Sequence, residues 1–175
     1  MDLAEHQLTL KRHRDLDGRN IDPWIRRFLL ALLVSTVVLA LLNTFGQLPA
    51  TSTARTPVAT LGVTAPERVR GGLLFEARFT VTAVGRALKQ PELVLSSGWF
   101  ESMTLNTTEP EPKEERNDNG RVVLTYDEIP AGRKLVVWLQ FQANPANLGS
   151  QRQEVELFDG TERLLGTTRS MFVFP

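Results

Sequence analysis

The chain has 175 residues, and its 20 basic and 20 acidic side chains give zero formal net charge, so composition offers no argument for nucleic-acid binding. Cysteine is absent, and both histidines, His6 and His13, lie before Arg27. These absences exclude thiol and imidazole catalysis, and metal sites built on thiolate or imidazole, from all later residues. We therefore expect no cofactor and no metal.

Residues 1–23 are expected to form a short cytoplasmic tail. The segment mixes charges of both signs with few large apolar residues, which is typical of disordered chain. Its basic cluster, Lys11 to Arg14, has the chemistry to contact anionic lipid headgroups, although Asp15 and Asp17 oppose that contact.

An apolar run follows the tail. Residues 28–45 carry no charge, and as a helix they would span roughly 27 Å, close to the thickness of the hydrocarbon core. The sequence therefore predicts a transmembrane helix over residues 24–46, ended by Gly46 and Pro49.

Residues at the start of this helix are expected to lie at the membrane interface. Trp24 suits the headgroup level, and Arg26 and Arg27 belong to a group of basic residues that precede the span, whereas only Arg55 follows it closely. The positive-inside rule then places the N-terminus in the cytoplasm and the C-terminal part outside the cell membrane.

A cleaved signal peptide is the alternative interpretation. Signal peptides usually have 15–30 residues in all, whereas here about 27 residues come before the apolar run begins. The segments Leu48–Ala50 and Ser52–Ala54 are only passable cleavage sites. An uncleaved, single-pass signal-anchor is the favoured interpretation.

Small residues recur at four-residue spacing along the predicted helix. Ala31 and Ser35 form one such pair, and Thr36 and Ala40 form another. This spacing lets transmembrane helices approach closely, so these residues are candidates for a helix contact. Chance in a helix that contains Ala, Ser and Thr is the favoured explanation of the pattern.

Residues 47–57 are predicted to be a linker, because Thr, Ser, Ala and Pro dominate them. A flexible chain of this length has an end-to-end distance of roughly 15–20 Å. The following domain would therefore stay near the membrane surface, which suits a partner in or on the same membrane.

Residues 58–175 show short alternating runs separated by turn residues. In the run 73–84, five apolar residues share one face and polar residues share the other, which is the pattern of a half-buried strand. Asn119-Gly120 and Asp159-Gly160 are hairpin signals. Seven to eight such strands predict an all-β, Ig-like antiparallel β-sandwich, with the apolar C-terminus, Met171 to Pro175, as an inner strand.

The segment from Asn119 to Gly149 resembles the second half of bacterial surface Ig-like modules. It combines an apolar strand, a Pro-Ala-Gly turn, a long apolar strand and a loop that contains Pro and Gly. The whole chain, with DPWIRRFLLALL, RGGLLFEARF and GWFESMTLNT, resembles actinobacterial single-pass membrane proteins with an extracytoplasmic Ig-like domain. The resemblance implies the fold and a spacer or contact role, and it implies no activity.

Trp138 is the leading candidate for partner contact. On the strand 134–143, Leu135, Val137, Leu139 and Phe141 share one face, so that Trp138 would face outwards beside glutamines. An exposed Trp can stack on a sugar or anchor a protein partner. The alternative is that another segment covers it.

Trp99 and Phe100 are further candidates for partner contact, with a hydrophobic plug beneath a loop as the alternative. Four glutamates, at 109, 111, 114 and 115, are interpreted as part of a solvated loop, although paired carboxylates can support glycoside hydrolysis or bind calcium. Arg68 and Arg70 are interpreted as part of a solvated turn.

The sequence thus favours a membrane-anchored, non-enzymatic interaction or accessory protein. Its expected partners are membrane lipid and a membrane or envelope protein, or a second copy of itself. A carbohydrate or cell-wall binding module that uses Trp138, Trp99 and Tyr126 is the alternative. A hydrolase that depends on Glu109 or Glu111 is the third hypothesis.

Overall fold

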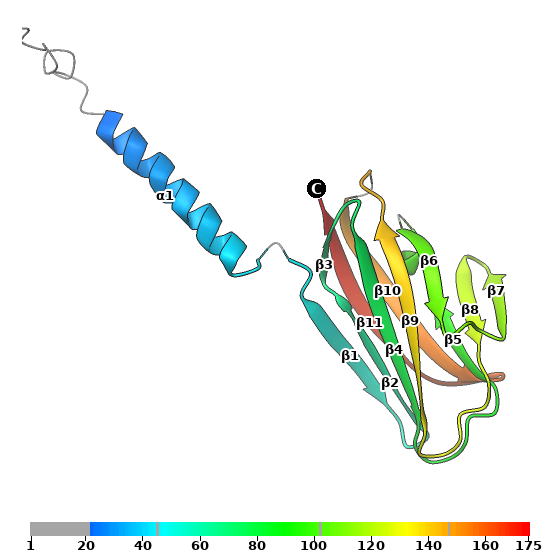
Figure 1. Ribbon diagram of the computed structural model, residues 1–175. Coiled ribbons are helices and arrows are strands. Elements are labelled where there is room, and N and C mark those ends of the chain that lie inside the picture. Colours follow the sequence, from blue (N-terminus) through cyan, green and yellow to red (C-terminus); the bar gives the residue numbers. More distant parts are fainter. Residues whose placement is uncertain (1–21, 45, 102, 147) are drawn as a thin grey trace, which may run out of the picture. The chain divides into compact units, whose positions relative to one another are not determined.

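The computed structural model describes residues 22–44, 46–101, 103–146 and 148–175 (Figure 1). The chain divides into two compact units, one that ends at Thr44 and one that begins at residue 45. The predicted cytoplasmic tail, up to residue 21, lies outside the described residues. The second unit is called the β-domain below.

The first unit is the helix α1, Asp22–Leu41. It stops before Gly46, the predicted end, because the backbone turns at Asn43, whose φ is 54°. The amide of Thr44 donates to the carbonyl of Leu39, and that of Asn43 donates to Ala40, which is the hydrogen-bond pattern of a Schellman motif. The helix of 20 residues still spans about 30 Å.

The β-domain is a sandwich of two sheets, one with strand order β1-β2-β4-β9-β6 and one with order β3-β11-β10-β5-β8-β7 (Figure 1). The predicted all-β sandwich preceded by one N-terminal helix is confirmed, although the described residues form more strands than predicted. The strands are β1 (Pro49–Arg55), β2 (Ala59–Pro66), β3 (Arg68–Arg70), β4 (Leu74–Ala83), β5 (Pro91–Leu95), β6 (Met103–Glu109), β7 (Glu114–Asp118), β8 (Arg121–Thr125), β9 (Lys134–Ala143), β10 (Gly149–Asp159) and β11 (Glu162–Phe174).

The linker predicted for residues 47–57 is wrong over most of its length. Residues Pro49–Arg55 form β1, which pairs antiparallel with β2 from Pro49↔Pro66 to Arg55↔Thr60. Thr and Ser occur in linkers, but Thr also favours strands, and here its alternation with half-buried small residues fits the edge of a sheet. The β-domain therefore begins before residue 58.

The core lies between the sheets and follows the predicted alternation. On β4 the inward residues Phe75, Ala77, Phe79, Val81 and Ala83 are all buried. The C-terminal strand β11 pairs with β10 on one side and in parallel with β3 on the other, which confirms the predicted inner strand.

Two predicted solvated segments instead form short edge strands. The hairpin β7–β8 turns at Asn119 and Gly120, whose φ values of 51° and 79° match a type I′ turn. This hairpin draws Glu114 and Glu115 into β7. The predicted turn around Arg68 and Arg70 is the strand β3, because its central residue, Val69, is buried.

Candidate interaction surface

Trp138 lies on the outer face of the five-stranded sheet. Its neighbours on β9, Val137 and Leu139, are fully buried, whereas the Trp138 side chain is 38% exposed. The alternation along β9 therefore places the indole ring outwards, as predicted. A large aromatic ring on an open sheet face is available to a partner.

The indole ring is held by its neighbours across the strands. Arg78 on β4 lies opposite Trp138, with its guanidinium carbon 5.2 Å from the ring centroid, so the two form a cation–π contact. Glu109 on β6 lies opposite Trp138 on the other side. The contact restricts both long side chains, which reduces the entropy that a partner must remove on binding.

Two shallow hollows flank the indole ring. We call the central residues the Trp138 surface: Glu76, Arg78, Glu109, Val136 and Trp138. This surface combines one aromatic ring with one cation and two carboxylates. The first hollow is lined by Glu76, Glu109, Pro110, Val136 and Trp138, and the second by Gln47, Pro49, Thr64, Pro66, Glu76, Arg78 and Trp138.

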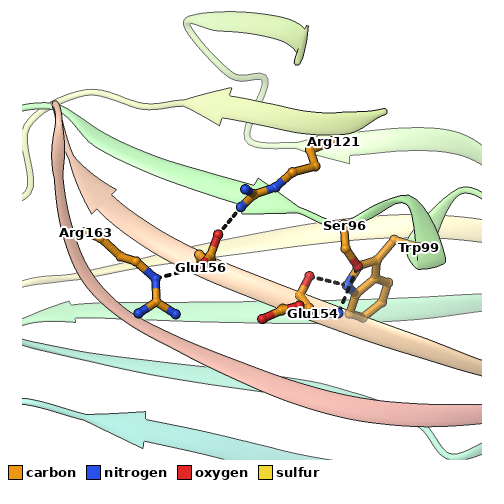
Figure 2. Close-up of polar contacts among 6 residues, drawn as sticks. All are labelled: Ser96, Trp99, Arg121, Glu154, Glu156 and Arg163. Atoms are coloured by element: carbon orange, nitrogen blue, oxygen red, sulfur yellow. Dashed lines mark hydrogen bonds and ion pairs between the residues drawn. The ribbon is translucent and has the colours of Figure 1, made fainter. Parts of the chain in front are cut away.

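Trp99 does not contribute to a contact surface, because it is fully buried in the core. Its ring packs against Phe79 and Phe141, with centroid distances of 5.2 and 5.7 Å. Its indole N–H donates to the carbonyl of Glu154 at 3.2 Å (Figure 2). The prediction of partner contact at Trp99 is therefore wrong, and the alternative, a hydrophobic plug, describes it.

The short 3-10 helix η1, Ser97–Trp99, carries this plug. Gly98 allows the close approach, since a Cβ at this position would lie 1.9 Å from the carbonyl oxygen of Arg152 on β10. Ser96 adds a second link to β10 through its hydroxyl, which accepts a hydrogen bond from the amide of Glu154 at 3.0 Å (Figure 2). Phe100, the third predicted contact residue, is half-buried and packs against the core.

Burial also removes Tyr126 from the predicted carbohydrate platform. Tyr126 is 5% exposed, and burial raises the pKa of its phenol. Of the three aromatic residues that the carbohydrate hypothesis uses, only Trp138 lies on the surface. The three residues therefore do not form the set of exposed aromatic rings on which a sugar could stack.

The predicted hydrolase residues are not drawn into an enclosed site. Glu109, Glu111, Glu114 and Glu115 are all exposed, as a solvated segment requires. Within the described ranges, no group of three or more Asp, Glu, His or Cys side chains could hold a metal ion.

The outer face of the six-stranded sheet differs from the Trp138 surface, because ion pairs cross it. Glu156 on β10 accepts hydrogen bonds from Arg121 on β8 and Arg163 on β11 (Figure 2). The Glu156 side chain is only 13% exposed, so these arginines cover it. Contacts of this kind satisfy the polar groups internally and leave fewer of them for a partner.

Sequence reasoning missed two buried polar residues between the sheets. Gln153 and Arg169 lie opposite each other on β10 and β11 and are 0% and 8% exposed. Arg169 donates through Nη2 to the carbonyls of Ala65 and Pro66, both at 2.8 Å, and burial lowers its pKa. The period-2 frame that buries Met171 and Val173 also points Arg169 inwards, so the signal was present in the sequence.

The two hydroxyl groups of α1 are hydrogen-bonded within the helix. The hydroxyl of Ser35 donates to the carbonyl of Ala31 at 2.7 Å, and that of Thr36 donates to Leu32 at 2.9 Å. These bonds remove the need for a second helix to satisfy the hydroxyl groups. Helix contact at Ala31, Ser35, Thr36 and Ala40 stays a prediction.

Trp24 and Arg27 contact each other at the start of α1, and their place at a membrane interface stays a prediction. Trp24 is exposed, and the guanidinium of Arg27 lies over its ring at 5.5 Å from the centroid. Among the described residues, Pro23–Leu41 is the one helix that is long and apolar enough to cross a membrane. A signal sequence near an N-terminus meets the same criterion, so length and apolar composition do not distinguish an anchor from a signal sequence.

No protein-family model and no curated protein matches the sequence. Solved structures with a similar fold include a cohesin module from a family 33 glycoside hydrolase of Clostridium perfringens, with 16% identity and a TM-score of 0.46, over 67% of this chain and 98% of that chain. Another is the seventh ScaB type I cohesin from Pseudobacteroides cellulosolvens, with 9% identity and a TM-score of 0.40, over 61% of this chain and 86% of that chain. A third is AvmM, which catalyses macrocyclization in alchivemycin A biosynthesis, with 8% identity and a TM-score of 0.44, over 73% of this chain and 89% of that chain. Similarities this low carry no argument about function.

Proposed function

We propose that this protein is a non-enzymatic interaction module, anchored in the cell membrane by α1, whose β-domain binds a membrane or envelope protein through the Trp138 surface. The observation that carries the proposal is the exposed indole of Trp138, held by Arg78 on an uncovered sheet face.

The anchor is supported by the chemistry of α1. The helix has 20 residues, and no charged residue follows Arg27 within it. Its side chains are exposed, and its two hydroxyl groups are bonded to its own carbonyls, so hydrocarbon can surround it without leaving polar groups unsatisfied. With Arg26 and Arg27 on the cytoplasmic side, the β-domain lies outside the membrane.

A protein partner suits the Trp138 surface better than a small ligand does. Trp and Arg are the residues that most often dominate protein interfaces, and they act best when neighbouring groups exclude water. Glu76 and Glu109 supply charges that favour a partner of complementary charge. The hollows are shallow and open, whereas small-molecule sites are usually deep and mostly enclosed.

A non-enzymatic role is supported by the exposure of the candidate acids. Catalysis needs groups held in a partly enclosed site where burial and neighbouring charges tune them. Glu109 and Glu111 are exposed on the surface. Glu111 lines a hollow at the start of β9, and the same hollow contains an ion pair between the well-exposed side chains of Lys113 and Asp127.

The test is purification of the tagged full-length protein from its own membranes in mild detergent, with Trp138→Ala and Val84→Ala as matched variants. Val84 is an exposed apolar residue outside the Trp138 surface. We expect one protein to co-purify in fixed ratio with the wild type and with Val84→Ala. Loss of a central Trp costs about 2 kcal/mol or more, so Trp138→Ala should recover far less of it.

Recovery of the wild type alone, or equal recovery with all three forms, would contradict the proposal. The carbohydrate hypothesis makes a different prediction, since cell-wall glycan fragments would then quench the fluorescence of Trp138 in a saturable way. A titration that separates wild type from Trp138→Phe would support it.

A further inference from the structure

Exposed hydrophobic side chains gather at one end of the β-domain. We call this the entry end, because β1 begins there and β11 ends there. Of the large hydrophobic residues described as exposed in the β-domain, only Trp138 and Val84 lie elsewhere. The five at the entry end are Leu48 at 57%, Leu73 at 48%, Leu74 at 50%, Leu148 at 49% and Phe172 at 50%.

The segments that carry these residues are bonded to one another. The amide of Gly71 donates to the carbonyl of Phe174 at 2.8 Å, and that of Gly72 donates to Ala143 at 2.8 Å. The turn between β3 and β4 also touches the turn between β9 and β10, since a Cβ on Gly71 would lie 2.9 Å from Cα of Pro145. In Figure 1 these turns and the C-terminus lie at the same end. The entry end is therefore a connected platform.

Position and charge indicate what the platform contacts. Residues 42–48 join α1 to β1, and seven extended residues reach at most about 25 Å. If α1 spans a bilayer, the entry end cannot move far from the lipid surface. On β3, opposite Phe174, the side chain of Arg70 is exposed, and a guanidinium suits lipid phosphate.

We propose that the entry end rests on the outer surface of the same bilayer, with the four leucines and Phe172 in the headgroup region and Arg70 directed at lipid phosphate. The proposal depends on the anchor of the proposed function. Single exposed leucines need no explanation, but five apolar side chains on one platform form a patch that water solvates poorly. Contact with the interface removes their apolar area from water.

Docking of this kind would limit the orientations of the β-domain. The Trp138 surface lies on a sheet face rather than on the entry end, so it would face sideways along the membrane. A protein in the same membrane could then reach it. A freely swinging domain would lose more orientational entropy on binding such a partner.

The absence of cysteine allows a direct test with single-cysteine variants of the full chain. Leu73→Cys and Leu148→Cys report on the entry end, Val84→Cys is the matched exposed control, and Val38→Cys reports on α1. Each carries an environment-sensitive fluorophore. The proteins are placed in nanodiscs of phosphatidylcholine and phosphatidylglycerol that contain lipids spin-labelled near the headgroup.

We expect the lipid spin label to quench the probes at positions 73 and 148 roughly twofold or more over the probe at 84, with aqueous iodide showing the reverse order. Arg70→Gln should weaken the lipid quenching in discs rich in phosphatidylglycerol. Probes at 73 and 148 that behave like the probe at 84, while position 38 is quenched, would overturn docking and leave the anchor standing.

Two further outcomes would also overturn the proposal. Protection from iodide without lipid quenching would mean that protein, such as a second copy of the chain, covers the entry end. Absence of lipid quenching at position 38 would remove the anchor and, with it, both proposals. Because positions 73, 148 and 84 are exposed, the labels should leave the fold intact, which circular dichroism checks.

Discussion

Replacing the two tryptophans of the β-domain one at a time should have opposite consequences. Trp99 is fully buried, and Trp138 is 38% exposed on a sheet face. We predict that Trp99→Ala strongly destabilises the fold, although it replaces no residue of the Trp138 surface. Trp138→Ala should leave the fold nearly as stable and remove the partner.

The magnitude for Trp99 follows from its surroundings. A buried aromatic side chain of 150–250 Å² is worth about 4–6 kcal/mol at ~25 cal/mol per Å², and large-to-small core changes typically cost about 3–5 kcal/mol. The indole N–H bond to the carbonyl of Glu154 adds about 1 kcal/mol. Since domains are stable by only about 5–15 kcal/mol, Trp99→Ala will be close to unfolding.

The assay is urea unfolding of the full-length protein in detergent micelles, followed by circular dichroism in the β-sheet region. Trp99→Phe keeps a ring beside Phe79 and Phe141, and should cost only about 1–2 kcal/mol. Trp138→Ala should cost less than about 1 kcal/mol, although it loses the cation–π contact with Arg78. Equal losses of stability for Trp99→Ala and Trp138→Ala would refute the assignment of one to the core and the other to the surface.

Three other predictions concern stability. Gly98→Ala should cost about 3 kcal/mol in the same assay, because its Cβ would meet the carbonyl oxygen of Arg152 at 1.9 Å, whereas Gly62→Ala, with no contact closer than 3.9 Å, should cost little. Burial raises the pKa of Tyr126 above its ordinary value of 10, so the fold should lose stability as pH rises above about 10, where the unfolded phenol ionises first. As Tyr126 is the one tyrosine of the chain, the 295 nm absorbance should change only on unfolding, and Tyr126→Phe should reduce that loss of stability. Glu156→Gln should cost about 1 kcal/mol at low salt and less in 1 M NaCl, and an equal cost at both salt concentrations would argue against its two arginine ion pairs.

The strands that the sequence predicted best are those with one solvent-exposed face and one buried face. On β4 and β9, strict alternation fixed which residues face the core, and with it the outward position of Trp138. The hairpin signals at Asn119-Gly120 and Asp159-Gly160 also mark turns between paired strands. Such predictions rest on local geometry that a few neighbouring residues determine.

Features that depend on distant residues were harder to predict. The segment with Trp99 is too short to show a period, and its burial depends on contact between Gly98 and β10. The strand β1 looks like a linker until β2 is known to pair with it. The gathering of Leu48, Leu73 and Leu148 at one end likewise requires the topology, because these residues are far apart in the sequence.

In the proposed topology, α1 is retained as an anchor and holds the β-domain outside the membrane. The most direct test labels Val84→Cys in intact cells with a membrane-impermeant maleimide. The chain has no other cysteine, and position 84 is exposed. We predict labelling before lysis, on a protein that resists alkaline carbonate extraction and keeps its residues before α1. Labelling only after lysis, or a soluble protein whose N-terminus lies near residue 51 or 55, would contradict the anchored topology.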